Sequence, residues 1–112
     1  MVAKFRLWLD TKNGQSVLGD GKWRLLKAIE KKGSLAAACR SLKISYRKAW
    51  GDLNKLQNAL DIPLVKLHRG GSKGGITILT QKGKELIEAY GSLHRDIEKA
   101  AQKAYDKHIK NL

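Results

Sequence analysis

Apolar residues alternate with polar or aromatic ones at the start of the chain. Phe5, Leu7 and Leu9 follow the period of two that is typical of a half-buried strand. Asn13-Gly14 then supplies a turn whose residues tolerate left-handed torsions, so the chain can return as a second strand. We therefore predict a β-hairpin over residues 3–18.

The next apolar pattern has helical spacing. Trp23, Leu26 and Ile29 fall on one face of a short amphipathic helix. Asp20 is placed to cap the start of this helix, and Gly33 is placed to end it.

Two more helices are predicted immediately afterwards, and only three or four residues separate them. Ser34 and Ser45 each stand where an N-cap is expected. Such a tight join between two short, serine-capped helices is typical of a helix-turn-helix. The apolar stripes are Leu35, Ala38, Cys39 and Leu42 in the second helix and Ala49, Leu53, Leu56 and Leu60 in the third.

A second hairpin follows the third helix, as a wing does. Pro63 is expected to end that helix, because proline lacks a donor and restricts the residue before it. Residues 64–67 and the β-branched run 76–79 are predicted as strands, joined by a glycine-rich tip at residues 70–75.

Thr80 is predicted to cap a long last helix. Its apolar residues alternate spacings of four and three, which is typical of a coiled-coil contact. The predicted dimerisation residues are Leu86, Tyr90, Leu93, Ile97, Ala100 and Ala104.

These elements predict a mainly α fold with small β-hairpins, namely a winged helix-turn-helix with a long C-terminal dimerisation helix. We expect a single domain over residues 1–112. It divides into an N-terminal hairpin, a three-helix core, a wing and a long helix, at residues 1–18, 20–62, 64–79 and 80–112.

The charge of the chain points to a polyanionic partner. The net charge is +13, and residues 22–74 hold 13 Lys and Arg against three acids, or +10 of that total. A positive surface of this size attracts nucleic acid first and anionic lipid second.

Composition excludes several other classes. A content of 42% hydrophobic and 29% charged residues predicts a folded chain, and no apolar run approaches the roughly 20 residues that span a bilayer. We expect a cytoplasmic protein without membrane contact. His68, His94 and His108 lie in different elements and Cys39 is alone, so we expect no enzyme, no metal site and no cofactor.

The polar face of the third helix carries the residue types that read bases. Arg47 and Asn54 have the bidentate geometry that matches guanine and adenine edges, with Lys48 and Lys55 beside them. Gly51 lies in the middle of this face, where it indicates either close approach of a ligand or a tolerated surface glycine.

Other residues are candidates for phosphate contact. The glycine-rich tip leads into a strand, so it does not match a nucleotide-cradling loop, and Arg69, Ser72 and Lys73 are better interpreted as wing contacts to DNA. Tyr46 can reach a phosphate with its hydroxyl or simply pack, whereas Trp50 borders the apolar stripe and is assigned to the core.

Three segments together resemble the DNA-binding domain of ModE-type molybdate-responsive transcriptional regulators. They are the run Ile44-Ser45-Tyr46-Arg47-Lys48-Ala49-Trp50 with Asn54, the glycine-lysine wing at residues 70–75, and Leu79-Thr80-Gln81-Lys82-Gly83. The similarity runs from about Gly19 to Tyr105, and parts of it extend to the broader LysR-type winged helix-turn-helix.

The resemblance implies a homodimer that places two recognition helices on promoter half-sites of double-stranded DNA. Matched residue by residue, the DNA contacts would be Ser45, Tyr46, Arg47, Lys48, Asn54 and Lys73. Two departures stand out: Gly51 replaces an expected acidic residue, and the chain stops at Leu112, before the family's molybdate-binding domains. Molybdate binding by these residues is therefore not expected.

Two alternatives to a sequence-specific regulator remain at this point. One is an architectural protein that binds nucleic acid through charge alone. The other is a winged helix that contacts a protein partner and no DNA. The sequence gives neither an operator nor the sign of regulation.

Overall fold

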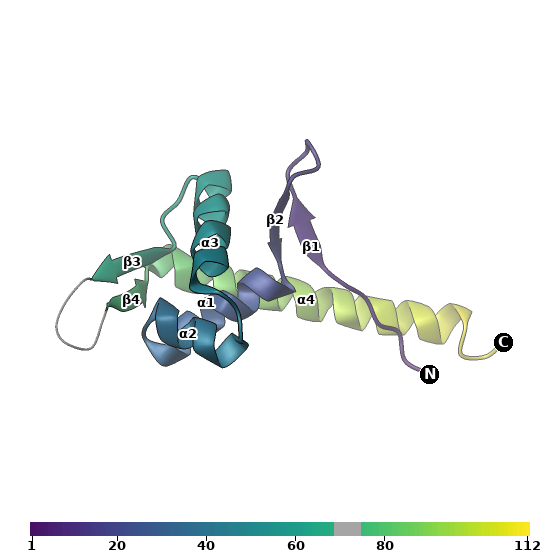
Figure 1. Cartoon of the computed structure of the whole chain (residues 1–112). Helices are drawn as coiled ribbons and strands as arrows, with labels where there is room; N and C mark the ends of the chain where they lie inside the picture. The colour runs from purple at the N-terminus through teal and green to yellow at the C-terminus, as the bar shows by residue number, and fades with distance from the viewer. Residues whose placement is uncertain (69–74) are drawn as a thin grey trace.

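The computed structural model describes residues 1–68 and 75–112 (Figure 1). In these residues four helices combine with two small antiparallel hairpins, β1 with β2 and β3 with β4, which confirms the predicted winged helix-turn-helix with a long last helix. The elements are β1 (Trp8–Asp10), β2 (Ser16–Gly19), α1 (Asp20–Lys32), α2 (Leu35–Leu42), α3 (Tyr46–Leu60), β3 (Val65–His68), β4 (Ile76–Leu79) and α4 (Gln81–His108).

Hydroxyl caps start three of the helices, as predicted. The side chains of Ser34, Ser45 and Thr80 each accept a hydrogen bond of 3.0 Å from the backbone N–H three residues further on. Each cap satisfies one of the donors that a helix leaves free at its start. Gly33 ends α1 with φ 78°, a left-handed conformation that glycine adopts without strain.

Two predicted helix boundaries are wrong. Asp20 does not cap α1, because Gly19 takes the cap position without a side-chain bond and the Asp20 carboxylate accepts the Tyr90 hydroxyl at 2.6 Å. Pro63 does not end α3 either. The helix ends at Leu60 because Asp61 turns left-handed with φ 53° and donates its N–H back to the last turn.

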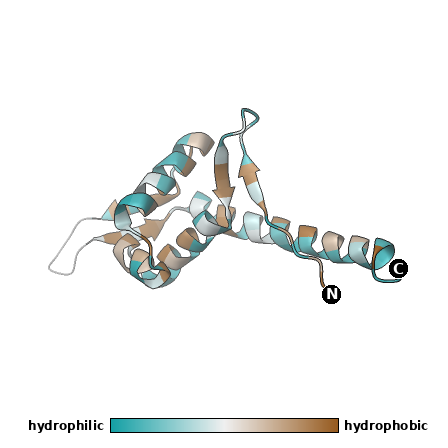
Figure 2. Ribbon diagram, turned by 45° about the vertical axis from the view of Figure 1, so that its right-hand side comes forward, coloured by the Kyte–Doolittle hydropathy of each residue, from teal (hydrophilic) through white to brown (hydrophobic). Residues whose placement is uncertain are grey.

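The first hairpin is shorter than predicted, because pairing begins only at Trp8. The preceding residues 1–7 run alongside α4, and both termini lie at the same end of the molecule (Figures 1 and 2). Phe5 and Leu7 are half-buried there, and the Phe5 ring lies 4.8 Å from the His94 ring. The apolar alternation thus reflects packing against a helix at residues 3–7 and strand pairing only from residue 8.

The core lies between α1, α2 and α3 and is closed by the wing and the first half of α4. α1 contributes Leu25, Leu26 and Ile29, and Tyr90 of α4 is only 2% exposed. Trp23 fixes α4 against α1 by donating its indole N–H to the Ile87 carbonyl at 3.1 Å. Beyond this contact α4 extends past the body of the protein, which gives the molecule a longest dimension of 62 Å (Figure 1).

Candidate nucleic-acid interface

The core fixes the orientation of α3. Ala49, Leu53 and Leu56 are fully buried, and the connection from α2 turns at Lys43 in a left-handed conformation, φ 57°. Because one face of α3 is held in the core, the opposite face points outward. This is the arrangement in which a helix-turn-helix presents its second helix to the major groove.

Most of the predicted DNA-contacting residues are accessible on α3. Ser45, Arg47, Lys48 and Lys55 are exposed, and the Tyr46 side chain is 51% exposed. Asn54 is half-buried at the edge of this face. The predicted wing residues Arg69, Ser72 and Lys73 lie outside the described residues.

Charge is not uniform along the face. The Lys48 ammonium pairs with the Asp52 carboxylate at 2.8 Å, which offsets its charge in the first turn. Arg47 and Lys55 take part in no ion pair among the described residues, so their charges are available to a ligand. The Ser45 oxygen accepts from the Lys48 N–H, and its own hydroxyl hydrogen can still be donated.

Gly51 is half-buried on this face, and a β-carbon built there meets no atom within 4 Å. The protein itself therefore has room for a larger residue at this position. A steric requirement for glycine would have to come from a bound molecule.

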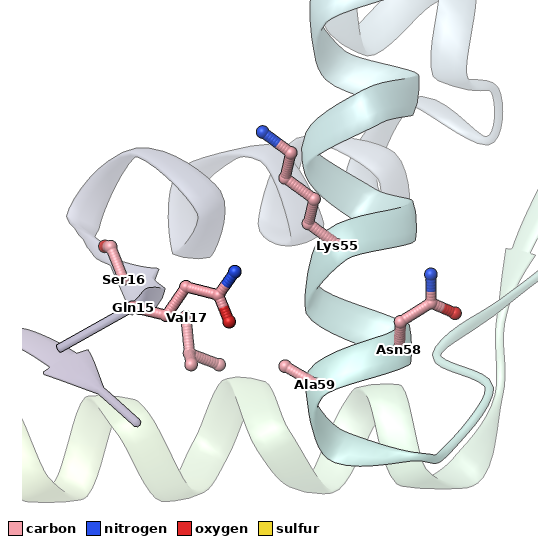
Figure 3. Close-up of a pocket in the computed structure, with 6 residues that line it drawn as sticks. All are labelled: Gln15, Ser16, Val17, Lys55, Asn58 and Ala59. Atoms are coloured by element: carbon pink, nitrogen blue, oxygen red, sulfur yellow. The ribbon is translucent and has the colours of Figure 1, made fainter. Parts of the chain in front are cut away.

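A groove extends the α3 surface toward the first hairpin (Figure 3). In this view Gln15 and Val17 point toward α3, and Ala59 and Lys55 reach into the space between the two elements. No local sequence pattern assigns the hairpin to this surface, because the hairpin and the last turns of α3 lie far apart along the chain. The groove is lined by Gln15, Ser16, Val17, Lys55, Asn58 and Ala59.

Three polar side chains, those of Gln57, Thr77 and Thr80, position the wing. Sequence patterns identified Thr80 as a helix cap but did not identify the other two. The Gln57 side-chain oxygen accepts from the backbone N–H groups of Leu64 and Val65 at 2.7 and 3.1 Å, which ties α3 to the start of β3. Thr77 is buried, and its hydroxyl accepts from the Leu35 N–H at 2.9 Å. Thr80 caps α4 and also donates to the Pro63 carbonyl at 2.7 Å.

The structure gives other predicted residues a packing role. Trp50 packs against the core, and Cys39 is buried, with burial raising the pKa of its thiol above the ordinary value. The described residues contain no cluster of three metal-ligating side chains. Among them there is also no helix long and apolar enough to cross a membrane.

The structure divides the predicted dimer seam on α4. Leu86 packs against the core of its own chain, and the Tyr90 hydroxyl is bonded to the Leu7 carbonyl and the Asp20 carboxylate. Leu93 is 37% exposed. Further along, Ile97 is half-buried, and Ala100 and Ala104 are exposed. The part of the seam that remains accessible therefore begins at Leu93.

A family model of lysR-type bacterial regulatory helix-turn-helix proteins matches residues 21–84. The match runs from the first turn of α1 to the first turn of α4 and includes the helix-turn-helix and the wing. The chain belongs to the lysR family of bacterial regulatory helix-turn-helix proteins.

Curated relatives within this family connect the chain to ModE-type proteins. It is 37% identical over 95 residues to the molybdenum transport protein ModE of Azotobacter vinelandii, which covers 85% of this chain and 35% of the relative. It is 38% identical over 82 residues to the molybdenum-pterin-binding protein MopB of Rhodobacter capsulatus, with 73% and 30% covered. The DNA-binding transcriptional dual regulator ModE of Escherichia coli K12 is 35% identical over 82 residues, with the same coverage.

The chain thus spans only about a third of the length of these relatives. The matched region has the sequence and fold of a ModE-type DNA-binding domain, which confirms the family resemblance.

Proposed function

We propose that this protein is a sequence-specific regulator that binds double-stranded DNA through α3 and acts as a homodimer. The observation that carries the proposal is the exposed face of α3, which presents Arg47 and Lys55 with no ion-pair partner among residues 1–68 and 75–112, in a chain of the lysR family. The ligand is DNA, so we place the protein in the cytoplasm, and we assign it no enzymatic role.

Arg47 and Lys55 have different tasks in this proposal. Arg47 lies in the first turn of α3, where a guanidinium can donate two parallel bonds to a guanine edge. Lys55 lies two turns further along beside the groove, where an ammonium neutralises phosphate whatever the sequence. Tyr46, with its exposed ring, and Ser45 are placed to contact the backbone next to Arg47.

Selection of bound duplexes from a random DNA pool tests the proposal. At about 0.15 M salt, exposed charges are screened beyond about 8 Å, so charge alone retains little DNA. We expect an inverted repeat whose half-sites lie about one helical turn apart. Retained DNA without any shared motif would favour the architectural alternative, and no retention would favour a protein partner.

Single-residue variants then distinguish recognition of bases from binding through charge alone. Arg47→Ala should weaken binding to the selected site by roughly 1–3 kcal/mol and leave random DNA almost unaffected, whereas Lys55→Ala should weaken both alike and reduce the salt dependence. Lys103→Ala, which removes the same charge from the exposed far part of α4, is the matched control. Equal effects of Arg47→Ala on both kinds of DNA would contradict base reading.

The homodimer is supported by the part of α4 from Leu93 onward. Its exposed apolar positions, Leu93, Ala100 and Ala104, have no covering element among the described residues. A helix that extends from the body with an uncovered apolar stripe is stabilised when a second helix packs against it.

A further inference from the structure

α1 carries a second cationic surface, which faces away from α3. At about 100° per residue, Arg24, Lys27 and Lys31 occupy an arc opposite Leu25, Leu26 and Ile29, the three residues that α1 buries in the core. All three cations are exposed. The core separates this arc from the exposed face of α3.

The N-terminal segment continues the surface. Arg6 and Trp8 face outward on alternate positions, and the indole of Trp8 is 58% exposed. A groove lined by Arg6, Trp8 and Arg24 joins this segment to the start of α1, and it shares no lining residue with the groove beside α3. We call Arg6, Trp8, Arg24, Lys27 and Lys31 the rear surface.

The cations of the rear surface are free to meet a ligand. No ion pair among the described residues includes any of the four. The Lys27 ammonium lies 3.4 Å from the centre of the Trp23 ring, a cation–π contact that holds it in place without neutralising it. Carboxylates also lie near: Asp20 lines the groove and accepts the Tyr90 hydroxyl, and Glu30, which precedes Lys31, lines a separate hollow together with Glu85 and Glu88.

We propose that the rear surface binds the phosphate backbone of a second DNA duplex while α3 holds the first. Arg24 and Lys31 stand seven positions apart, about 10 Å along the helix axis, which is close to the rise of three phosphates along one strand. A protein partner is less suitable, because a protein interface needs an apolar centre and the rear surface offers only Trp8. The proposal rests on the proposed function in that DNA is the ligand of both surfaces.

Stoichiometry with a short duplex tests the proposal. A duplex of about 12 base pairs, roughly one helical turn, covers one surface of one protomer, so the count does not depend on dimerisation. At about 0.05 M salt, sedimentation velocity should show two duplexes per protomer for the unaltered protein. Arg24→Gln/Lys31→Gln should bind one. Lys84→Gln/Lys103→Gln, which removes the same charge from exposed positions on α4, should still bind two.

Other outcomes separate this proposal from the proposed function. One duplex per protomer for the unaltered protein, or two for Arg24→Gln/Lys31→Gln, would overturn the rear site and leave α3 as the DNA surface. Arg47→Ala/Lys55→Ala should lose the duplex at α3 and keep the one at the rear surface. If this variant keeps two duplexes, the assignment to α3 fails instead. Circular dichroism spectra of all variants serve as the control that each one is folded.

Discussion

The first half of α4, residues 81–94, is tied to three other parts of the protein. In the described chain, residues 95–108 form hydrogen bonds and ion pairs only within α4 and with residues 109 and 110 directly after it. Tyr90 bonds to the N-terminal segment and to α1, and Gly83 lies against the start of β3. Short isolated helices are marginal in water, so the far half depends on its neighbours, which are the N-terminal segment and, in the proposed homodimer, a second copy. One helix therefore serves two purposes: changes in its first half should alter folding, and changes in its second half should alter association.

The largest effect on folding is expected at Gly83. A β-carbon there would lie closer to the Leu64 carbonyl oxygen than any real contact allows. Overpacking typically costs about 1–3 kcal/mol, and we expect Gly83→Ala to lie at the upper end of this range. Neither the backbone of α4 nor that of Leu64 can shift without moving the wing. Urea unfolding measures the loss, and Ala89→Gly, at an exposed position in the same helix, is a control for helix propensity. Unchanged stability of Gly83→Ala would show that α4 is not seated tightly on β3.

Tyr90→Phe should have the next largest effect. It removes the hydroxyl that donates to the Leu7 carbonyl at 2.9 Å and the Asp20 carboxylate at 2.6 Å, so we expect a loss of roughly 1.5–3 kcal/mol at neutral pH. Tyr46→Phe removes an exposed hydroxyl and should change stability by less than about 0.5 kcal/mol. Equal effects of the two variants would contradict a structural role for the Tyr90 hydroxyl.

The dependence of stability on alkaline pH tests the role of the Tyr90 hydroxyl in a second way. Burial, together with the neighbouring Asp20 carboxylate, raises the pKa of Tyr90 well above its ordinary value of 10.0. The folded state therefore keeps this proton at a pH where the unfolded state loses it, and stability declines as the pH rises above about 10. We expect a shallower decline in Tyr90→Phe than in Tyr46→Phe, measured by urea unfolding at several pH values.

Ile97→Lys should separate association from folding. Ile97 lies beyond the anchored half of α4, so the change should alter the unfolding free energy of a protomer by less than about 1 kcal/mol and yield monomers in sedimentation. Ser92→Lys adds the same charge outside the apolar stripe and should leave the dimer intact. A persistent dimer in Ile97→Lys would mean that the copies associate through another surface.

The separation of interacting residues along the chain explains which features the sequence could predict. Ser34, Ser45 and Thr80 act through bonds to backbone three residues away, so a local pattern predicts these caps correctly. Asp20 has the right residue type for a cap, but its partner is Tyr90, 70 residues away, and local reasoning cannot reveal that choice.

Periodicity alone also does not show which neighbour each residue of an apolar stripe packs against. The spacing of four and three in α4 does not distinguish Tyr90, which packs inside its own chain, from Leu93, which remains exposed. On α3 the pattern predicted an outward polar face, and the structure shows one, because Ala49, Leu53 and Leu56 on the opposite side are fully buried. The groove between α3 and the first hairpin, and the bonds from Gln57 to the wing, required the three-dimensional arrangement.

A small and favourable effect on folding is expected at Gly51, and it is informative for that reason. Alanine fits the protein there, since a β-carbon meets nothing within 4 Å, and it should stabilise α3 by up to about 1 kcal/mol. If DNA approaches this part of the helix closely, the added methyl group should weaken binding to the selected site while the protein becomes more stable. Fluorescence anisotropy and urea unfolding of Gly51→Ala measure both quantities. A variant that is more stable and binds as well as the unaltered protein would identify Gly51 as a tolerated surface glycine, and the contact would then centre on the first turn of α3 at Arg47.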